Sequence, residues 1–396
     1  MQDLKGDFPI FAKNPGLVYL DSACTSLKPR QVIDAEMSYY TEYGACGGRS
    51  SHRLGRKVTE VTEQAREKVA SFVGADAQGL IWTKNTTEGL NLLADSFDFS
   101  GKKKVVTSVL EHHAVLLPLM RLRDERKIEL TIIQANGDGE IGKDAWVKAI
   151  DRQTALVMTN CGTNTTGRKG DVASIARLAH DNGALICVDG AQGVPHSRMD
   201  MRKANLDFLC FSGHKMLGPT GIGVFAAKKE HLKKLKPYIV GGGTVKTVSE
   251  DRADYVDDHT RFEAGIQDYA GILGLAAACD YLKKIGMENV ERHEAALAQA
   301  ILKELEAVGA IVYGPKTAEK SATYSFNLVN AKAHDVALML DKDDIALRSG
   351  FFCAQPAMEA LGAKDGAIRV SGYVYNSIED IKRFGESLGK ISVLYG

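Results

Sequence analysis

The stretch LDFLCFSGHKMLGP, residues 206–219, joins an apolar run to a lysine and a glycine-containing turn. An uninterrupted apolar run is typical of a strand that is buried on both faces of a sheet. Similar runs alternate with amphipathic helical stretches along the chain, at residues 80–83, 104–107, 155–159, 184–188 and 223–226. Because this alternation favours parallel strands, the sequence predicts an α/β fold with a mostly parallel sheet covered by helices.

The pattern changes after about residue 290, where a long helical segment precedes an alternating strand at 322–329. This change predicts a smaller α+β domain. We therefore expect an N-terminal arm at 1–30 that packs with the small domain, a large domain at 31–285, and a small C-terminal domain at 286–396.

The composition excludes several classes of protein. The 396 residues include 50 Lys+Arg and 50 Asp+Glu, so the formal net charge is zero and nothing favours nucleic acid or an anionic membrane as a partner. The longest apolar stretch, at 269–279, is too short to span a bilayer, and no secretory signal is visible. The 7 cysteines are scattered without metal-ligand or disulfide spacing, so we expect a cytoplasmic protein without a metal site.

Polar residues follow several of the predicted strands, at the edge of a parallel sheet where ligands bind. Lys215 follows one strand, and burial there would favour the neutral amine that forms a Schiff base, although a lone lysine is more often a surface residue. Asp189 ends another apolar strand, which is costly unless the carboxylate meets a cation such as a protonated ring nitrogen.

Two further strand ends complete a possible ligand site. Thr86 and Thr87 open a helix that could hold a phosphate, or they could simply cap that helix. One of the adjacent residues His112 and His113 could stack on a flat ligand, or both could be structural. Together these features indicate pyridoxal 5′-phosphate, which needs a lysine and a carboxylate partner for its ring nitrogen. No nucleotide-binding glycine motif occurs.

The chain closely resembles class V, fold-type I pyridoxal-phosphate enzymes, specifically the Suf-type group II cysteine desulfurases and selenocysteine lyases. The resemblance runs nearly end to end and is most specific in the segments 86–88, 111–114, 189–192, 212–219 and 348–356. It implies that Lys215 holds the cofactor, that Asp189 pairs with its ring nitrogen and that His113 stacks on the ring. It implies the further cofactor contacts Thr86, Thr87, Asn164, Gln192, Ser212 and His214, and the substrate contacts Arg369, Arg348, His52 and Asn164.

The same resemblance makes Cys353 the reactive thiol. Independently of it, Arg348 lies five residues upstream and would favour the thiolate. The implied reaction converts L-cysteine to L-alanine, with Lys215 removing the α-proton, His113 as a candidate acid/base and a persulfide formed on Cys353. The sulfur would pass to an acceptor or scaffold protein for iron–sulfur cluster assembly, and a homodimer is expected.

Some features depart from the resemblance. Phe351 and Phe352 replace the usual His-His pair, and Ile266 replaces a threonine that reaches the partner subunit's phosphate. Cys24 and Cys46 fall in segments near the substrate, so a second sulfur-handling thiol is conceivable. The alternatives to a cysteine desulfurase are a selenocysteine lyase acting on L-selenocysteine, a cysteine sulfinate desulfinase, a class V aminotransferase, or a non-enzymatic sulfur-carrier or scaffold protein. The loop at 348–356 argues against an aminotransferase, which needs no thiol.

Overall fold

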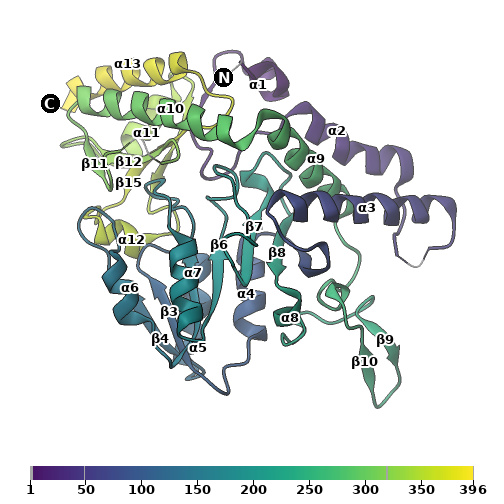
Figure 1. Ribbon diagram of the computed structural model, residues 1–396. Coiled ribbons are helices and arrows are strands. Elements are labelled where there is room, and N and C mark those ends of the chain that lie inside the picture. The colour runs from purple at the N-terminus through teal and green to yellow at the C-terminus, as the bar shows by residue number, and fades with distance from the viewer. Residues whose placement is uncertain (1–2, 49, 318–319, 396) are drawn as a thin grey trace.

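A computed structural model describes residues 3–48, 50–317 and 320–395 (Figure 1). Its largest sheet has seven strands in the order β2-β8-β7-β6-β5-β3-β4. Strands β4, β3, β5, β6 and β7 pair in parallel, and β8 pairs antiparallel with both β7 and β2. The α/β fold with a mostly parallel sheet is therefore confirmed. The strand bounds are β2 Leu80–Thr83, β3 Lys104–Ser108, β4 Glu129–Ile133, β5 Thr154–Asn160, β6 Leu185–Asp189, β7 Phe208–Ser212 and β8 Gly223–Ala227.

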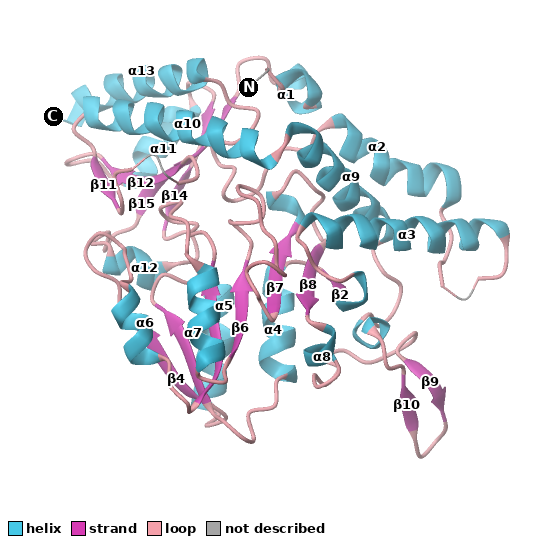
Figure 2. Ribbon diagram, viewed as in Figure 1, coloured by secondary structure: helices cyan, strands magenta, loops and turns pink. Residues whose placement is uncertain are grey.

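Helices cover both faces of this sheet (Figure 2), which explains why its strands are apolar throughout. Alternate residues of β7 point to opposite faces of the sheet and pack in different hydrophobic cores. Leu209 packs in the core shared with α3, α7 and α9, and Cys210 packs in the core shared with α4 and α5. The helices of this part of the chain are α2 Arg30–Ser38, α3 Arg53–Phe72, α4 Thr86–Ser96, α5 His113–Asp124, α6 Lys143–Ala149, α7 Val172–Asp181, α8 Lys229–Leu232 and α9 Tyr269–Ile285.

A second, four-stranded antiparallel sheet has the order β11-β12-β15-β14 and a separate hydrophobic core. Gly286, with φ +86°, separates α9 from the long helix α10 that begins this part of the chain. Its elements are α10 Met287–Ala307, β11 Ile311–Tyr313, β12 Thr323–Asn327, α11 Ala333–Asp341, β14 Arg348–Gly350, α12 Gln355–Ala360, β15 Ala367–Ser371 and α13 Ile378–Tyr395.

The N-terminal segment lies against this smaller sheet. After the short helix α1 (Pro9–Lys13), strand β1 (Val18–Tyr19) pairs in parallel with β13 (Ile345–Ala346). Asp21 then bridges to Ser371 at the end of β15. This pairing carries the residues that follow β1 to the boundary between the two sheets.

Between β8 and α9 the chain forms a hairpin of β9 (Val245–Val248) and β10 (Ala253–Tyr255) that extends away from the large sheet (Figure 1). Within the described ranges, no helix is long and apolar enough to cross a membrane. The same residues include no cluster of three or more potential metal ligands.

Candidate active site

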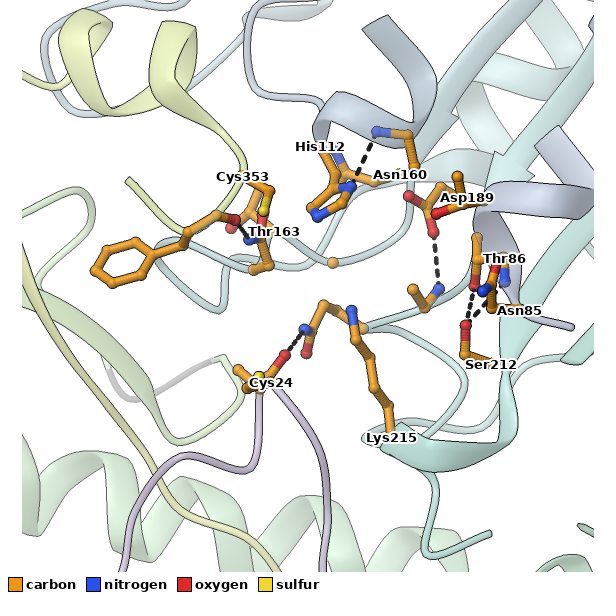
Figure 3. A pocket seen from close by; sticks show the side chains of 18 of the residues that line it. Cys24, Asn85, Thr86, His112, Asn160, Thr163, Asp189, Ser212, Lys215 and Cys353 are labelled. Atoms are coloured by element: carbon orange, nitrogen blue, oxygen red, sulfur yellow. Dashed lines mark hydrogen bonds between the residues drawn. The ribbon is translucent and has the colours of Figure 1, made fainter. Parts of the chain in front are cut away.

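A cavity of about 220 Å³ opens where β5, β6 and β7 end, beside the smaller sheet (Figure 3). Because these three strands are parallel, their carboxyl ends meet at one edge and bring distant segments together. The cavity is lined by most of the side chains predicted from the sequence, namely Thr86, Thr87, Asn164, Asp189, Gln192, Ser212, His214, Lys215, Arg348, Cys353 and Arg369.

Lys215 and Asp189 form the charged centre of the cavity. Lys215 lies on the turn after β7, where burial lowers the pKa of its ammonium group against the opposing charge of Asp189. Asp189 ends β6, and its Oδ1 accepts a hydrogen bond from the Ala191 amide at 2.9 Å. Burial raises the pKa of this carboxyl group despite that bond and the nearby lysine. A bound ligand that pairs with the amine and the carboxyl group would offset the free-energy cost of burying them.

The N-terminus of α4 also lines the cavity, close to Asp189 (Figure 3). Thr86 Oγ1 lies 2.7 Å from Ser212 Oγ, which also accepts a bond from the Thr86 amide at 2.8 Å. The side chain of Asn85 caps the helix by accepting from the Glu88 amide at 3.0 Å. Burial, together with Lys215 and Lys28, lowers the pKa of the neighbouring His214 to about 4, so its imidazole is neutral. Hydroxyls beside a helix N-terminus suit a phosphate group.

Arg369 approaches the cavity from β15 of the smaller sheet. Its side chain is 2% exposed, and it donates to Asp21 Oδ1 at 2.9 Å and to the Asn164 carbonyl at 3.1 Å. Its Nε is buried without a hydrogen-bond partner among the described residues. An incompletely satisfied, buried guanidinium at a cavity wall is suited to bind a carboxylate.

Cys353 lies on a tight turn whose backbone is strained. Phe352 and Cys353 have φ values of +55° and +54°, a region that residues with side chains rarely occupy. Two hydrogen bonds hold the turn: Asn164 Nδ2 donates to the Phe352 carbonyl at 2.7 Å, and the His113 amide donates to the Cys353 carbonyl at 2.8 Å. Phe352 itself is buried, with its ring 4.9 Å from the Arg369 guanidinium carbon. Cys353 is exposed at the cavity wall.

His112, and not the expected His113, lines the cavity. His112 is the N-cap of α5, and its Nδ1 accepts from the Ala114 amide at 3.0 Å (Figure 3). Burial, reinforced by Lys215, lowers its pKa to about 3. His113 is the first residue of the helix and turns toward the cysteine loop, where its Nε2 accepts from the Gln355 amide at 3.3 Å. The sequence does not distinguish two adjacent histidines, because their directions depend on the helix start.

His52 also lies outside the cavity lining of this chain. It is exposed and caps α3, with Nδ1 accepting from the Gly55 amide at 3.2 Å. Arg348 lies beside a different thiol from the one expected, since its Nη1 is 2.8 Å from the sulfur of Cys24. Sequence reasoning did not select the lining residues Asn85, Asn160 and Thr163. Asn160 is the last residue of the apolar strand β5 and Asn85 lies two residues after β2, so the position of each at a strand end was a usable signal.

Asn160 links the cavity to a buried carboxyl group. Its Nδ2 lies 2.8 Å from Glu111 Oε2, and Ser108 and Thr159 donate to Oε1 at 2.5 and 3.2 Å. Burial raises the pKa of Glu111 to about 7, against the effect of these donors. This network fixes the loop that carries His112.

The residues present fit pyridoxal phosphate. A lysine amine with a lowered pKa suits a covalent link to an aldehyde, and a buried carboxylate suits a protonated ring nitrogen. The α4 N-terminus with Ser212 and Thr86 suits the phosphate. All of these groups line one cavity, as a single ligand with three distinct functional groups requires.

Comparisons with known proteins agree with this chemistry. The aminotransferase class-V family matches residues 18–384. A probable cysteine desulfurase from Halalkalibacterium halodurans is 38% identical over 402 residues, covering 100% of this chain and 98% of the relative.

Two solved structures have the same fold. The apo cysteine desulfurase from Thermococcus onnurineus superposes with a TM-score of 0.95 at 35% identity, covering 99% of both chains. The cysteine desulfurase CsdA from Escherichia coli has a TM-score of 0.91 at 31% identity, covering 99% of this chain and 98% of that one. The chain therefore belongs to the aminotransferase class-V family of pyridoxal-phosphate enzymes and, within it, to the cysteine desulfurases.

Proposed function

We propose that this enzyme converts L-cysteine to L-alanine and leaves the sulfur as a persulfide on Cys353. The observation that carries the proposal is that one cavity contains both a half-buried lysine with a lowered pKa, Lys215, and an exposed thiol on a strained turn, Cys353. An aminotransferase would need the lysine but not the thiol. The turn is costly, since each left-handed residue costs about 1–3 kcal/mol, and such strain clusters at functional sites.

Substrate binding depends on Arg369. A cysteine zwitterion would place its carboxylate against this guanidinium, which Asp21 and the Asn164 carbonyl hold in place. Because the single carboxylate of Asp21 neutralises only part of the positive charge of Arg369 and Arg348, this side of the cavity remains suited to bind an anion. The carboxylate contact would fix which end of the substrate faces Cys353.

Pyridoxal phosphate, held by Lys215, Asp189, Gln192, His214 and the α4 N-terminus, would supply an electron sink that weakens bonds at the substrate's α-carbon. Lys215, whose pKa burial lowers, is the base for the α-proton once its amine is deprotonated. His112 replaces His113 as the candidate for proton transfer at the substrate's sulfur, because His112 lines the cavity in the neutral form.

The Cys353 thiolate attacks the substrate's sulfur, so that a sulfur–sulfur bond forms while the carbon–sulfur bond breaks. The three-carbon fragment is protonated and leaves as alanine. Cys353 is exposed, which supports transfer of the persulfide sulfur to an acceptor protein for iron–sulfur cluster assembly. The 7 cysteines are all free, as is usual in a reducing compartment such as the cytoplasm.

A homodimer is part of the same proposal. Ile266 is 70% exposed at the end of a segment anchored by the buried Arg66–Glu263 pair, in which Arg66 Nη1 and Glu263 Oε1 are 2.8 Å apart. An exposed isoleucine on a fixed segment supports an apolar contact with a second copy, in place of the phosphate contact that a threonine would make.

The test measures alanine and sulfide released from cysteine, with and without a thiol reductant, by the wild type and Cys353→Ser. Cys46→Ser is a matched control, because Cys46 is exposed and outside the cavity lining. We expect Cys353→Ser to lose alanine formation from cysteine and Cys46→Ser to keep it. Full activity of Cys353→Ser with cysteine would refute the proposal. The selenocysteine lyase alternative predicts instead that selenocysteine is turned over without Cys353, so both substrates are compared.

A further inference from the structure

The cavity contains a second thiol that the reaction described above does not use. Cys24 is half-buried and follows β1, so the pairing of β1 with β13 carries it to the cavity. Figure 3 shows Cys24 and Cys353 entering the same cavity from separate loops. The four cysteines of the two hydrophobic cores, Cys161, Cys187, Cys210 and Cys279, are buried and have no such access.

The guanidinium group of Arg348 lies against the sulfur of Cys24. Arg348 Nη1 lies 2.8 Å from Cys24 Sγ, a contact that stabilises negative charge on sulfur. Arg348 is also in β14, the strand that leads directly into the cysteine turn. The same residue therefore connects the two thiol-bearing loops.

A second observation, the buried Arg369 beside Cys24, indicates that this wall of the cavity receives an anionic group. Arg369 is 2% exposed and lines the cavity with Cys24, and its Nε has no hydrogen-bond partner among the described residues. Arg369 and Arg348 share the Asp21 carboxylate, so two guanidinium groups face one carboxylate. The remaining positive charge favours anionic groups, including a persulfide anion, beside Cys24.

We propose that Cys24 accepts the sulfane sulfur from Cys353 within the cavity. The inference rests on the proposed function, which must first form the persulfide. The Cys24 thiolate attacks the outer sulfur of the Cys353 persulfide. The bond between Cys353 Sγ and that sulfur breaks as the bond to Cys24 Sγ forms, the electron pair passes to Cys353 Sγ, and the proton released by Cys24 ends on Cys353. No oxidant or reductant is consumed.

The exchange returns Cys353 to its thiol form while the sulfur stays in the protein. A second molecule of the substrate L-cysteine can then react at Cys353 before an acceptor protein binds. The protein would therefore store two sulfane sulfurs in each subunit, one on Cys24 and one on Cys353.

The experiment uses the holoenzyme with a small excess of cysteine and no thiol reductant or acceptor protein. The reaction is quenched during the first burst, alanine is counted per subunit, and free thiols and persulfides are alkylated for peptide mass mapping. We expect about two alanines per subunit in the wild type and an extra sulfur on both the Cys24 and Cys353 peptides. Cys24→Ser should give about half the burst, with sulfur on Cys353 only.

Two further variants sharpen the test. Cys46→Ser removes an exposed thiol outside the cavity and should keep the wild-type burst. Cys353→Ser should leave Cys24 without extra sulfur, because the sulfur reaches Cys24 only through Cys353. Mapping the wild-type peptides needs no substitution, so a variant that fails to fold does not remove the test.

Each other outcome counts against the inference. A wild-type burst of about one alanine, with no sulfur on Cys24, would overturn it while leaving the proposed function intact. Extra sulfur on Cys24 in Cys353→Ser would make Cys24 a direct acceptor from the substrate. A disulfide between Cys24 and Cys353 with released sulfide would mean attack on the inner sulfur instead. No alanine from the wild type would refute the proposed function itself.

Discussion

The two adjacent histidines at the start of α5 give a direct test of the site, because only one of them lines the cavity. We compare His112→Asn with His113→Ala. Asparagine keeps an oxygen that can cap the helix, as His112 Nδ1 does for the Ala114 amide, while it removes the imidazole. Alanine at 113 keeps the backbone amide that bonds the Cys353 carbonyl and removes the bond from Gln355.

The expected magnitudes differ. Loss of a positioned acid/base group costs about 10²–10⁴-fold in rate, so His112→Asn should lower the burst rate of alanine formation by at least about 100-fold. His113→Ala loses one neutral hydrogen bond of about 0.5–1.5 kcal/mol, which corresponds to at most about tenfold. Thermal unfolding of both variants serves as the control that the fold is kept.

The protonation state of His112 gives a second measurement that does not depend on turnover. With a pKa of about 3, about one His112 ring in ten thousand is protonated at pH 7 in the cofactor-free protein. An imidazole NMR resonance that His112→Asn removes should therefore show no titration between pH 5 and 8. A His113→Ala rate loss above about 100-fold together with a near wild-type His112→Asn would refute the assignment.

Two other substitutions test charges at the site, and a third tests a buried carboxylate at the opposite end of β7. Asp189→Asn should raise the unfolding temperature of the cofactor-free protein, because burial raises the pKa of that carboxyl, and should lower the turnover of the loaded enzyme. Arg369→Lys should lower kcat/KM about 10–100-fold through the loss of one charge-assisted bond of about 1.5–3 kcal/mol. Asp207→Asn should cost about 3 kcal/mol in the free energy of denaturant unfolding at pH 7, since it removes the charge of a buried carboxylate that lies 2.7 Å from the partly exposed Lys228. Although burial raises the pKa of Asp207, bonds from His231, Lys228 and His180 lower it well below its usual value. The stabilisation by this aspartate is therefore present above the unfolded pKa of about 4 and declines as the pH falls toward the folded value, so the difference from Asp207→Asn should shrink in acid. A temperature shift of the opposite sign for Asp189→Asn, an unchanged kcat/KM for Arg369→Lys, or a pH-independent cost for Asp207→Asn would each contradict its prediction.

The sequence predicted the large sheet because each of its central strands is buried on both faces. Cys187 and Cys210 pack on one face while Val188 and Leu209 pack on the other, so the strands read as continuous apolar runs. The edge strand β4 (Glu129–Ile133) was not predicted, because its burial is partial and its residues are mixed. The hairpin of β9 and β10 was missed for the same reason, since its strands are mostly exposed and have no apolar face.

The site was predictable where chemistry sits at a strand end and unpredictable where it depends on contacts between segments far apart in the chain. Asp189 and Lys215 follow apolar strands, and their residue types alone indicate their chemistry. The direction of His112 depends on where α5 begins, and the partner of Arg348 depends on how β1 pairs with β13. That pairing is set by tertiary packing, and it places Cys24, 324 residues from Arg348, in contact with the guanidinium. The position of Cys24 in the cavity is therefore a property of the assembled fold and cannot be read from the sequence. Counting the sulfur atoms bound to each subunit tests directly whether this thiol takes part in sulfur transfer.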